Sequence, residues 1–286
     1  MSINGLQVFG IAFLVLLVAL GERWMQRRLV MTGALRQARL LALVAGFGGL
    51  IGATAWGQNL PYAFAWALPL VAARFLAVAA VAFGTVALRA AWIGAAGHLR
   101  LVAVMLLAYL GPLAVAVIML HLDRFNPAFP VTYVFFAIAV GMVGAALLIL
   151  IRLPYDERGL SSGQLGWIGN LAGLWGLVLF LWPAGPWPPL WPWPQDPLTT
   201  RLIAAMFLTV AATCHFAEGR AERRTAYILC VIYGFGIAVV VTLALLAAKP
   251  ASPAYLIFWA LVVLAALRGM VSERAVSPAR AQTHPD

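Results

Sequence analysis

Charged residues are scarce in this chain. They make up 10% of its 286 residues, and only nine of them are acidic, against 19 Lys and Arg. Hydrophobic residues reach 64%, and the mean hydropathy is +0.96. A soluble globule of this length needs more polar surface, so the composition excludes a soluble protein and predicts an integral membrane protein.

The few acidic residues are also absent from the long apolar runs. They lie at the ends of these runs or in the tail: Glu22, Asp123, Asp156, Glu157, Asp196, Glu218, Glu222, Glu273 and Asp286. A proton-coupled carrier or pump needs titratable groups in mid-membrane, which argues against proton coupling. The single lysine, Lys249, stands beside Pro250 outside the runs, which excludes a retinal-binding rhodopsin.

Signatures of catalysis and of metal binding are missing as well. The chain has no G-x-S-x-G, H-E-x-x-H or P-loop pattern, so we expect no enzymatic activity. His98 and His215 could face one haem iron, but the sequence has no haem-attachment motif and no second pair of histidines. His121 and Asp123 have no nearby Cys or second His at the spacing of metal ligands. Cys214 and Cys230 are expected to be packed small residues, and we expect no cofactor.

Nine apolar runs are present. Most reach the ~17–25 residues that a helix needs to cross a bilayer. We predict an all-α polytopic transmembrane helix bundle of about nine helices, with a single domain over 1–276 and a flexible tail over 277–286. The expected helices contain Leu6–Leu20, Leu40–Trp56, Ala63–Leu88, Leu101–Leu120, Val131–Ile151, Leu165–Leu181, Leu202–Phe216, Tyr227–Leu246 and Tyr255–Leu267.

The basic residues alternate between the two sides of such a bundle. Fifteen arginines fall in connections or ends on one side, and only Arg124, Arg201 and Lys249 fall on the other. This positive-inside bias places the N-terminus outside and the C-terminus in the cytoplasm, in the inner membrane of a bacterium. The net charge of +10 then serves contacts with membrane lipids and not nucleic acid. A membrane-protein partner or a second copy of the chain stays open.

Three short patterns occur twice in the same order. The matching segments are Glu22-x4-Arg27-Arg28 with Glu218-x4-Arg223-Arg224, Gly46-Phe47-Gly48 with Gly234-Phe235-Gly236, and Tyr62-x3-Trp66 with Tyr255-x3-Trp259. They predict a parallel repeat of helices one to three and seven to nine, as some transporters have. The alternative is chance similarity, because the ends of membrane helices favour the same residue types.

Arg74 is the one basic residue inside an apolar run. We expect it midway through the third helix, about 20 Å from either surface, and facing the bundle interior. Its expected neutral partners are the Tyr109 hydroxyl and carbonyls freed at Pro69 and Pro112. Two interpretations stay open: Arg74 ties kinked helices together, or it attracts an anionic ligand, a lipid headgroup or a partner's acid.

A segment rich in proline and tryptophan follows the sixth apolar run. The stretch from Trp182 to Pro197 contains Trp182, Trp187, Trp191 and Trp193. Proline at this density excludes a helix, and tryptophan prefers the headgroup layer. We expect a stiff strap across the outer interface, which serves either as an anchor for helices six and seven or as a lid or docking surface.

Two outer segments carry charges of both signs. Asp123 and Arg124 end the fourth helix, while Asp196 and Arg201 lie at the start of the seventh. Asp196 and nearby Thr199 can cap the free N–H groups of that helix. We expect ion pairs across the two loops, Asp123 with Arg201 or Asp196 with Arg124. They form either a clasp between loops or part of a polar ligand site under the strap.

These segments resemble parts of uncharacterised multi-spanning membrane proteins of actinobacteria and Chloroflexi. Those proteins read H-W-D-R-F and W-P-L-T-P-L-T-A-R where this chain has His121-Leu122-Asp123-Arg124-Phe125 and Trp193-Pro194 to Arg201. The chain departs from the pattern at Leu122 and at Gln195-Asp196. The group has no established activity, so the resemblance implies only that the two outer segments act together.

Two functions are consistent with these features. The first is a permease-like or lipid- or anion-binding membrane protein, with Arg74 attracting the ligand and the outer Asp/Arg pairs acting as gate or clasp. The second is a structural or assembly subunit of a larger membrane complex. The sequence favours neither.

Overall fold

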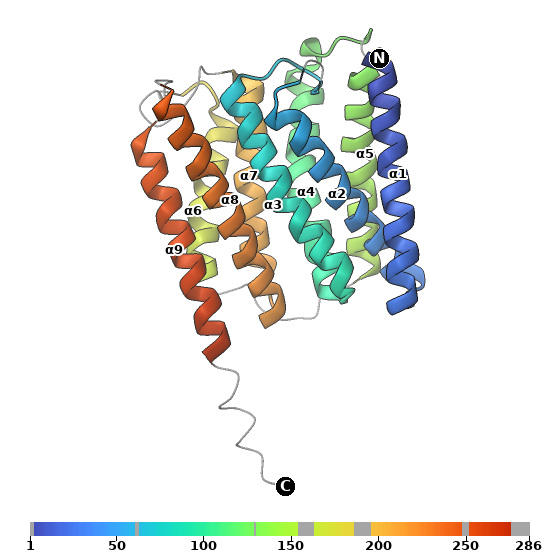
Figure 1. Ribbon diagram of the computed structural model, residues 1–286. Helices are drawn as coiled ribbons and strands as arrows, with labels where there is room; N and C mark the ends of the chain where they lie inside the picture. The colour runs from blue at the N-terminus through green and yellow to red at the C-terminus, as the bar shows by residue number, and fades with distance from the viewer. Residues whose placement is uncertain are drawn as a thin grey trace.

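A computed structural model describes residues 3–60, 63–128, 130–153, 163–185, 196–247 and 252–275. These residues form nine long helices, each apolar enough to cross a membrane (Figure 1). The predicted all-α polytopic bundle is confirmed, and a multi-pass protein of this kind contacts membrane lipids. The helices are α1 (Ile3–Arg28), α2 (Gly33–Gly57), α3 (Leu70–Ile93), α4 (Ala96–Leu120), α5 (Pro130–Arg152), α6 (Gln164–Leu181), α7 (Pro197–Phe216), α8 (Arg220–Leu246) and α9 (Pro253–Ala275), with a short 3-10 helix η1 (Leu122–Arg124) after α4.

The chain starts at one end of the bundle and finishes at the other (Figure 1). We call the first end the N-face; it holds the start of α1 and the connections α2–α3, α4–α5, α6–α7 and α8–α9. The opposite end is the C-face, with the remaining connections and the end of α9. In the topology predicted from the arginines, the N-face is the outer one.

The third helix begins later than the apolar run predicted. α3 starts at Leu70, because Pro69 occupies the N-cap position in an extended conformation, with φ −57° and ψ 142°. Proline also disfavours the helical conformation for the residue before it. The segment 63–69 is therefore non-helical, although Ala65 and Trp66 are buried.

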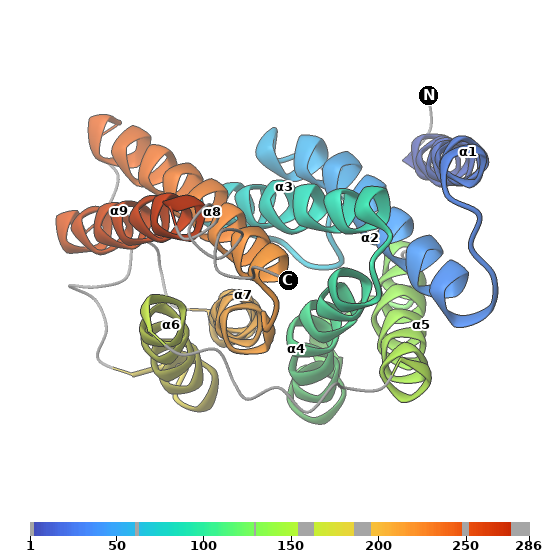
Figure 2. The ribbon, with the colours of Figure 1, turned by 90° about the horizontal axis from the view of Figure 1, so that it is seen from below.

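The helices form two layers, which are seen end-on from the C-face in Figure 2. One layer contains α9, α8, α3 and α2 in that order, and the other contains α6, α7, α4 and α5, while α1 packs on α2 at the edge. Within this arrangement α2 packs on α3 and α4 on α5, just as α6 packs on α7 and α8 on α9. The units α2–α5 and α6–α9 meet through the equivalent contacts α3 with α8 and α7 with α4.

The sequences of the two units support this equivalence. Tyr109 and Tyr233 occupy the same register position, counted from the first residues of α4 and α8. Further matches are Gly49-Leu50-Ile51-Gly52 with Gly173-Leu174-Trp175-Gly176, and Pro127-Ala128-x-Pro130 with Pro250-Ala251-x-Pro253. Because α2 and α6 are separated by an even number of crossings, the units run the same way through the membrane, as in a parallel repeat.

The repeat therefore joins α2–α5 to α6–α9, and not helices one to three to seven to nine as the sequence pattern suggested. Two of the three matched patterns lie on different kinds of element. Glu22 lies within α1, whereas Glu218 lies in the α7–α8 connection, and Trp66 precedes α3, whereas Trp259 lies within α9. The similarity between them reflects the residues that interfacial chain ends favour.

Glycine allows a close helix contact within each unit. A Cβ atom on Gly49 would lie 3.0 Å from the carbonyl oxygen of Ala80 on α3, and one on Gly176 would lie 3.1 Å from that of Ala204 on α7. In lipid, such small residues let helix backbones approach and pack without a hydrophobic driving force. The two units use the same device at corresponding helix pairs.

Substitution of either glycine tests this packing. Gly49→Ala and Gly176→Ala should each lower the thermal unfolding midpoint in detergent, because the added methyl group meets a backbone oxygen, at a cost of about 1–3 kcal/mol. Gly141→Ala on α5 is the matched control, since no atom lies within 4 Å of its added Cβ. The control should hold or gain stability from the helix propensity of alanine. Equal midpoints for Gly49→Ala and the control would contradict the close approach.

Candidate functional site

The start of α7 is tied to the end of α4 at the N-face. Asp196 caps α7, and its carboxylate accepts a hydrogen bond from the Thr199 backbone N–H at 3.2 Å. The same carboxylate accepts one from Arg124 Nη1 at 3.2 Å. The predicted cap and the predicted Asp196–Arg124 ion pair are both confirmed. The Arg124 side chain is 44% exposed, so solvent screens the pair and its contribution is modest.

Arg201 makes a second tie between the same helices. Its Nη1 lies 2.6 Å from His121 Nε2, and its Nε donates a hydrogen bond to the Phe180 carbonyl at 3.2 Å. The alternative pairing of Arg201 with Asp123 is wrong, because Asp123 is exposed on η1 and Arg201 turns to the ring of His121. The resemblance implied that the segments with His121 and Arg201 act together, but it did not predict this contact, since two basic side chains give no signal of pairing.

The Arg201 contact requires a neutral His121. Partial burial lowers the pKa of His121 below its ordinary value, and the nearby charge of Arg201 lowers it further, while Asp196 and Asp123 partly oppose this shift. A neutral imidazole offers Nε2 as an acceptor when the proton sits on Nδ1. The geometry therefore assigns the guanidinium as donor and His121 as acceptor.

The C-face carries its own polar contacts between the two units. Nη2 of Arg100 on α4 lies 3.5 Å from Oε1 of Glu218 in the α7–α8 connection, and both side chains are only 9% exposed. Burial raises the pKa of Glu218, Arg100 opposes that shift, and Glu222 adds to it. Arg89 Nε on α3 donates a hydrogen bond to Thr225 Oγ1 on α8 at 3.3 Å. The sequence did not predict these contacts: the two arginines served only to orient the bundle, Glu218 only matched the repeat pattern, and Thr225 gave no signal.

Aromatic rings fill the middle of the interface between the units. Phe83 on α3 lies between the two repeat-equivalent tyrosines, with its ring centroid 6.2 Å from Tyr109 and 5.9 Å from Tyr233. Tyr233 is fully buried, and its hydroxyl has no hydrogen-bond partner among the described residues. An unpartnered buried hydroxyl is costly, so it marks a place for water or for a polar ligand.

Arg74 does not lie at the expected depth. It stands in the second turn of α3, about 6 Å along the helix from Leu70, because the helix starts at Leu70 and not at Ala63. It is half-buried, and it shares a helix face with Leu70 and Val81, which are exposed. Tyr109, one of its expected partners, packs on Phe83 instead. Arg74 forms no hydrogen bond or ion pair with any described residue. The expected mid-membrane, inward-facing arginine is thus replaced by a half-buried one near the N-face, on the same helix face as two exposed residues.

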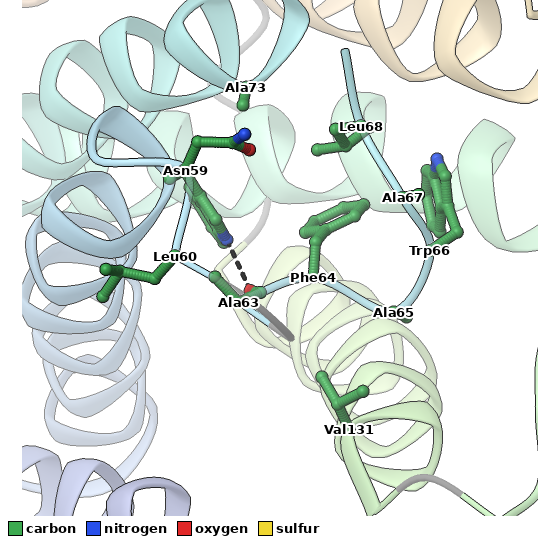
Figure 3. Close-up of a pocket in the computed structure, with 11 residues that line it drawn as sticks. Asn59, Leu60, Ala63, Phe64, Ala65, Trp66, Ala67, Leu68, Ala73 and Val131 are labelled. Atoms are coloured by element: carbon green, nitrogen blue, oxygen red, sulfur yellow. Dashed lines mark hydrogen bonds between the residues drawn. The ribbon is translucent and has the colours of Figure 1, made fainter. Parts of the chain in front are cut away.

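A cavity of about 540 Å³ opens beside the first turn of α3 at the N-face (Figure 3). We call it the N-face cavity; it lies against the end of α2, the non-helical segment and the start of α5. Trp56 Nε1 donates a hydrogen bond to the Ala63 carbonyl at 2.7 Å and fixes one wall. The lining residues are Trp56, Asn59, Leu60, Ala63, Phe64, Ala65, Trp66, Ala67, Leu68, Ala73 and Val131.

The tryptophan strap falls mostly outside the described residues. Trp182 caps the end of α6 and is 58% exposed, as expected for an interfacial tryptophan. Trp187, Trp191 and Trp193 lie in 186–195, which the structure does not describe. The strap as an anchor or lid therefore stays a prediction.

Removal of the Asp196 carboxylate tests the N-face tie. Asp196→Ala should lower stability by about 1–2 kcal/mol, since it loses both the cap of α7 and the ion pair. Asp123→Ala removes the same charge from the neighbouring exposed η1 and should change stability little. The unfolding midpoints of the purified proteins measure both effects. Equal losses in the two variants would show that the Asp196 contacts contribute nothing.

The His121 contact predicts a pH dependence. The pKa of His121 is lowered in the folded state, so the unfolded chain binds more protons below the ordinary value of 6.5. Its contribution to stability is therefore complete above pH 6.5 and falls as the pH drops below that value. His121→Gln should remove this part of the pH dependence between pH 5 and pH 7.5 in thermal unfolding. Parallel curves for the variant and the unmodified protein would contradict the assignment.

Comparison with known proteins adds no assignment to this geometry. No protein family, no curated protein and no solved structure matches the chain. The description of a multi-pass membrane protein therefore rests on its composition and on its nine apolar helices.

Proposed function

We propose that the protein is permease-like, with two four-helix units that open and close around a small polar solute bound at their interface. The N-face is the outer side in this proposal, as the arginine distribution predicts. The Tyr109–Phe83–Tyr233 region is the proposed binding region, and the polar contacts at the two faces are the proposed gates. Parallel repeats about an axis along the membrane normal are one of the architectures that transporters use.

One observation carries the proposal: the polar contacts between the units stand at the two ends of their interface. Among the described residues, Arg124 with Asp196 and His121 with Arg201 join the units at the N-face. Arg100 with Glu218 and Arg89 with Thr225 join them at the C-face. Within the part of the chain that the structure describes, none of these polar contacts lies in the aromatic middle, where the buried Tyr233 hydroxyl has no partner. When the contacts at one face break, the contacts at the other face still join the units and act as the hinge.

The N-face contacts are suited to a gate because they are weak. A solvent-exposed ion pair contributes about 0.2–1 kcal/mol, which thermal motion breaks readily. The C-face pair is more buried, and the loss of one partner would leave the other charged and unpaired at higher cost. We therefore expect the N-face to open more easily than the C-face in the absence of solute.

Thiol labelling of the interface tests this proposal. A Tyr109→Cys protein, with Cys214 and Cys230 replaced by alanine, is treated from the N-face with a membrane-impermeant maleimide. Asp196→Asn combined with Arg124→Gln should raise the labelling rate about fivefold, the factor that corresponds to about 1 kcal/mol. Asparagine still caps α7, so helix stability is kept.

Asp123→Asn is the matched control, because it removes a charge from the same face without breaking a contact between the units. It should leave the labelling rate unchanged. A rate that is equally low in the control and in the opened variant would mean that the bundle does not open. That result would favour the alternative function, a structural or assembly subunit of a membrane complex.

A further inference from the structure

The N-face cavity lies apart from the interface between the two units. Its described lining residues belong to α2, α3, α5 and the segments next to them, and none of these residues comes from the second unit. Its volume of about 540 Å³ falls within the range of small-molecule sites, about 300–1,000 Å³. The proposed gating neither uses nor explains it.

The wall of the cavity is aromatic and apolar on one side. Phe64 stands between two tryptophans, with its ring centroid 5.7 Å from Trp56 and 4.3 Å from Trp66 (Figure 3). Val131 contributes an apolar side chain from α5. These surfaces suit a hydrocarbon chain, since burial of apolar area is favourable by about 25 cal/mol per Å².

The other side of the cavity offers hydrogen-bond donors without partners. The backbone N–H groups of 64–68 donate no hydrogen bond to a described residue, although Ala65 and Trp66 are buried. The indole N–H of Trp66 is also buried without a partner, and Figure 3 shows the Asn59 carboxamide directed toward the space between Ala73 and Phe64. Free donors at the end of membrane-spanning helices are costly unless a ligand or water accepts from them.

One basic residue is the helix neighbour of a residue that lines the cavity. Arg74 directly follows Ala73, which lines the cavity, and no described carboxylate pairs with it. None of the described residues that line the cavity is acidic. Positive charge and free donors together call for an acceptor-rich anionic group, such as a phosphodiester, while the aromatic wall calls for a hydrocarbon chain.

We infer that the N-face cavity binds one phospholipid of the adjacent leaflet. Its acyl chain lies against Trp56, Phe64 and Trp66, and its phosphodiester accepts hydrogen bonds from Arg74 and from free N–H groups of the 63–69 segment. The lipid satisfies the donors that the non-helical segment leaves free at the membrane surface. Arg74 thereby acquires the anionic partner that the chain itself does not provide.

Binding is tested on the full-length protein by native mass spectrometry. Dioleoylphosphatidylglycerol is the probe, dioleoylglycerol supplies the same chains without phosphate, and inorganic phosphate supplies the anion without chains. One tightly retained dioleoylphosphatidylglycerol per protein is expected, with binding of each partial probe weaker by about tenfold or more. Equal retention of dioleoylglycerol, or equal protection by inorganic phosphate in thermal unfolding, would overturn the two-part site.

Substitutions distinguish a phospholipid bound in the N-face cavity from lipid that contacts the bundle elsewhere. Ala67→Trp fills the cavity from an exposed position, and Ala254→Trp places the same side chain at an exposed position near the N-face end of α9. The first should lower phospholipid retention about tenfold and the second should not. Arg74→Gln should also weaken retention, whereas Arg74→Lys should keep part of it, because a point charge still attracts phosphate. Unchanged retention in both Ala67→Trp and Arg74→Gln would overturn the inference, and Arg74→Gln decides alone if Ala67→Trp fails to fold.

Discussion

Water is absent from the hydrocarbon core of a bilayer, and most features of this protein depend on that constraint. Backbone polar groups must pair within each span, which helices achieve. Charged side chains gather at the two faces, so the polar contacts between the units lie there as well. The exceptions are therefore informative. The backbone N–H groups of 64–68, the Tyr233 hydroxyl and Arg74 have no hydrogen-bond or ion-pair partner among the described residues, and each lies in or next to a proposed ligand site.

The two units of the repeat pack in the same way, but the side-chain contacts that join them differ between the two equivalent helix pairs. α4 and α7 are joined at the N-face by His121 and Arg201, whereas α3 and α8 are joined at the C-face by Arg89 and Thr225. The glycine contacts inside each unit are alike. Each unit is thus packed by backbone approach, while side chains specific to one face hold the units together. This division favours motion between rigid units over motion within them.

The sequence predicted the features that depend on local properties and missed those that depend on how the chain packs. Helix spans and the Asp196–Arg124 tie follow from hydrophobic length, capping and charge, which are local properties. The start of α3 was misplaced because alanine and leucine before Pro69 are as apolar as the helix itself. That error also misplaced Arg74. The four-helix repeat and the His121–Arg201 contact depend on which helices pack together, so their short sequence matches became interpretable only with the fold. The N-face cavity depends on the path of a non-helical segment, which the sequence did not predict.

Electron–electron distance measurement across the N-face reports directly on motion between the two units. Spin labels are placed at Leu122 and Leu181, which are exposed and belong to different units, after Cys214 and Cys230 are replaced by alanine. We expect one short distance in the unmodified background and a second, longer one when Asp196→Asn and Arg124→Gln open the face. Breaking the C-face through Arg100→Gln should leave the short distance alone. A single unchanged distance in all three proteins would contradict two units that move about their interface.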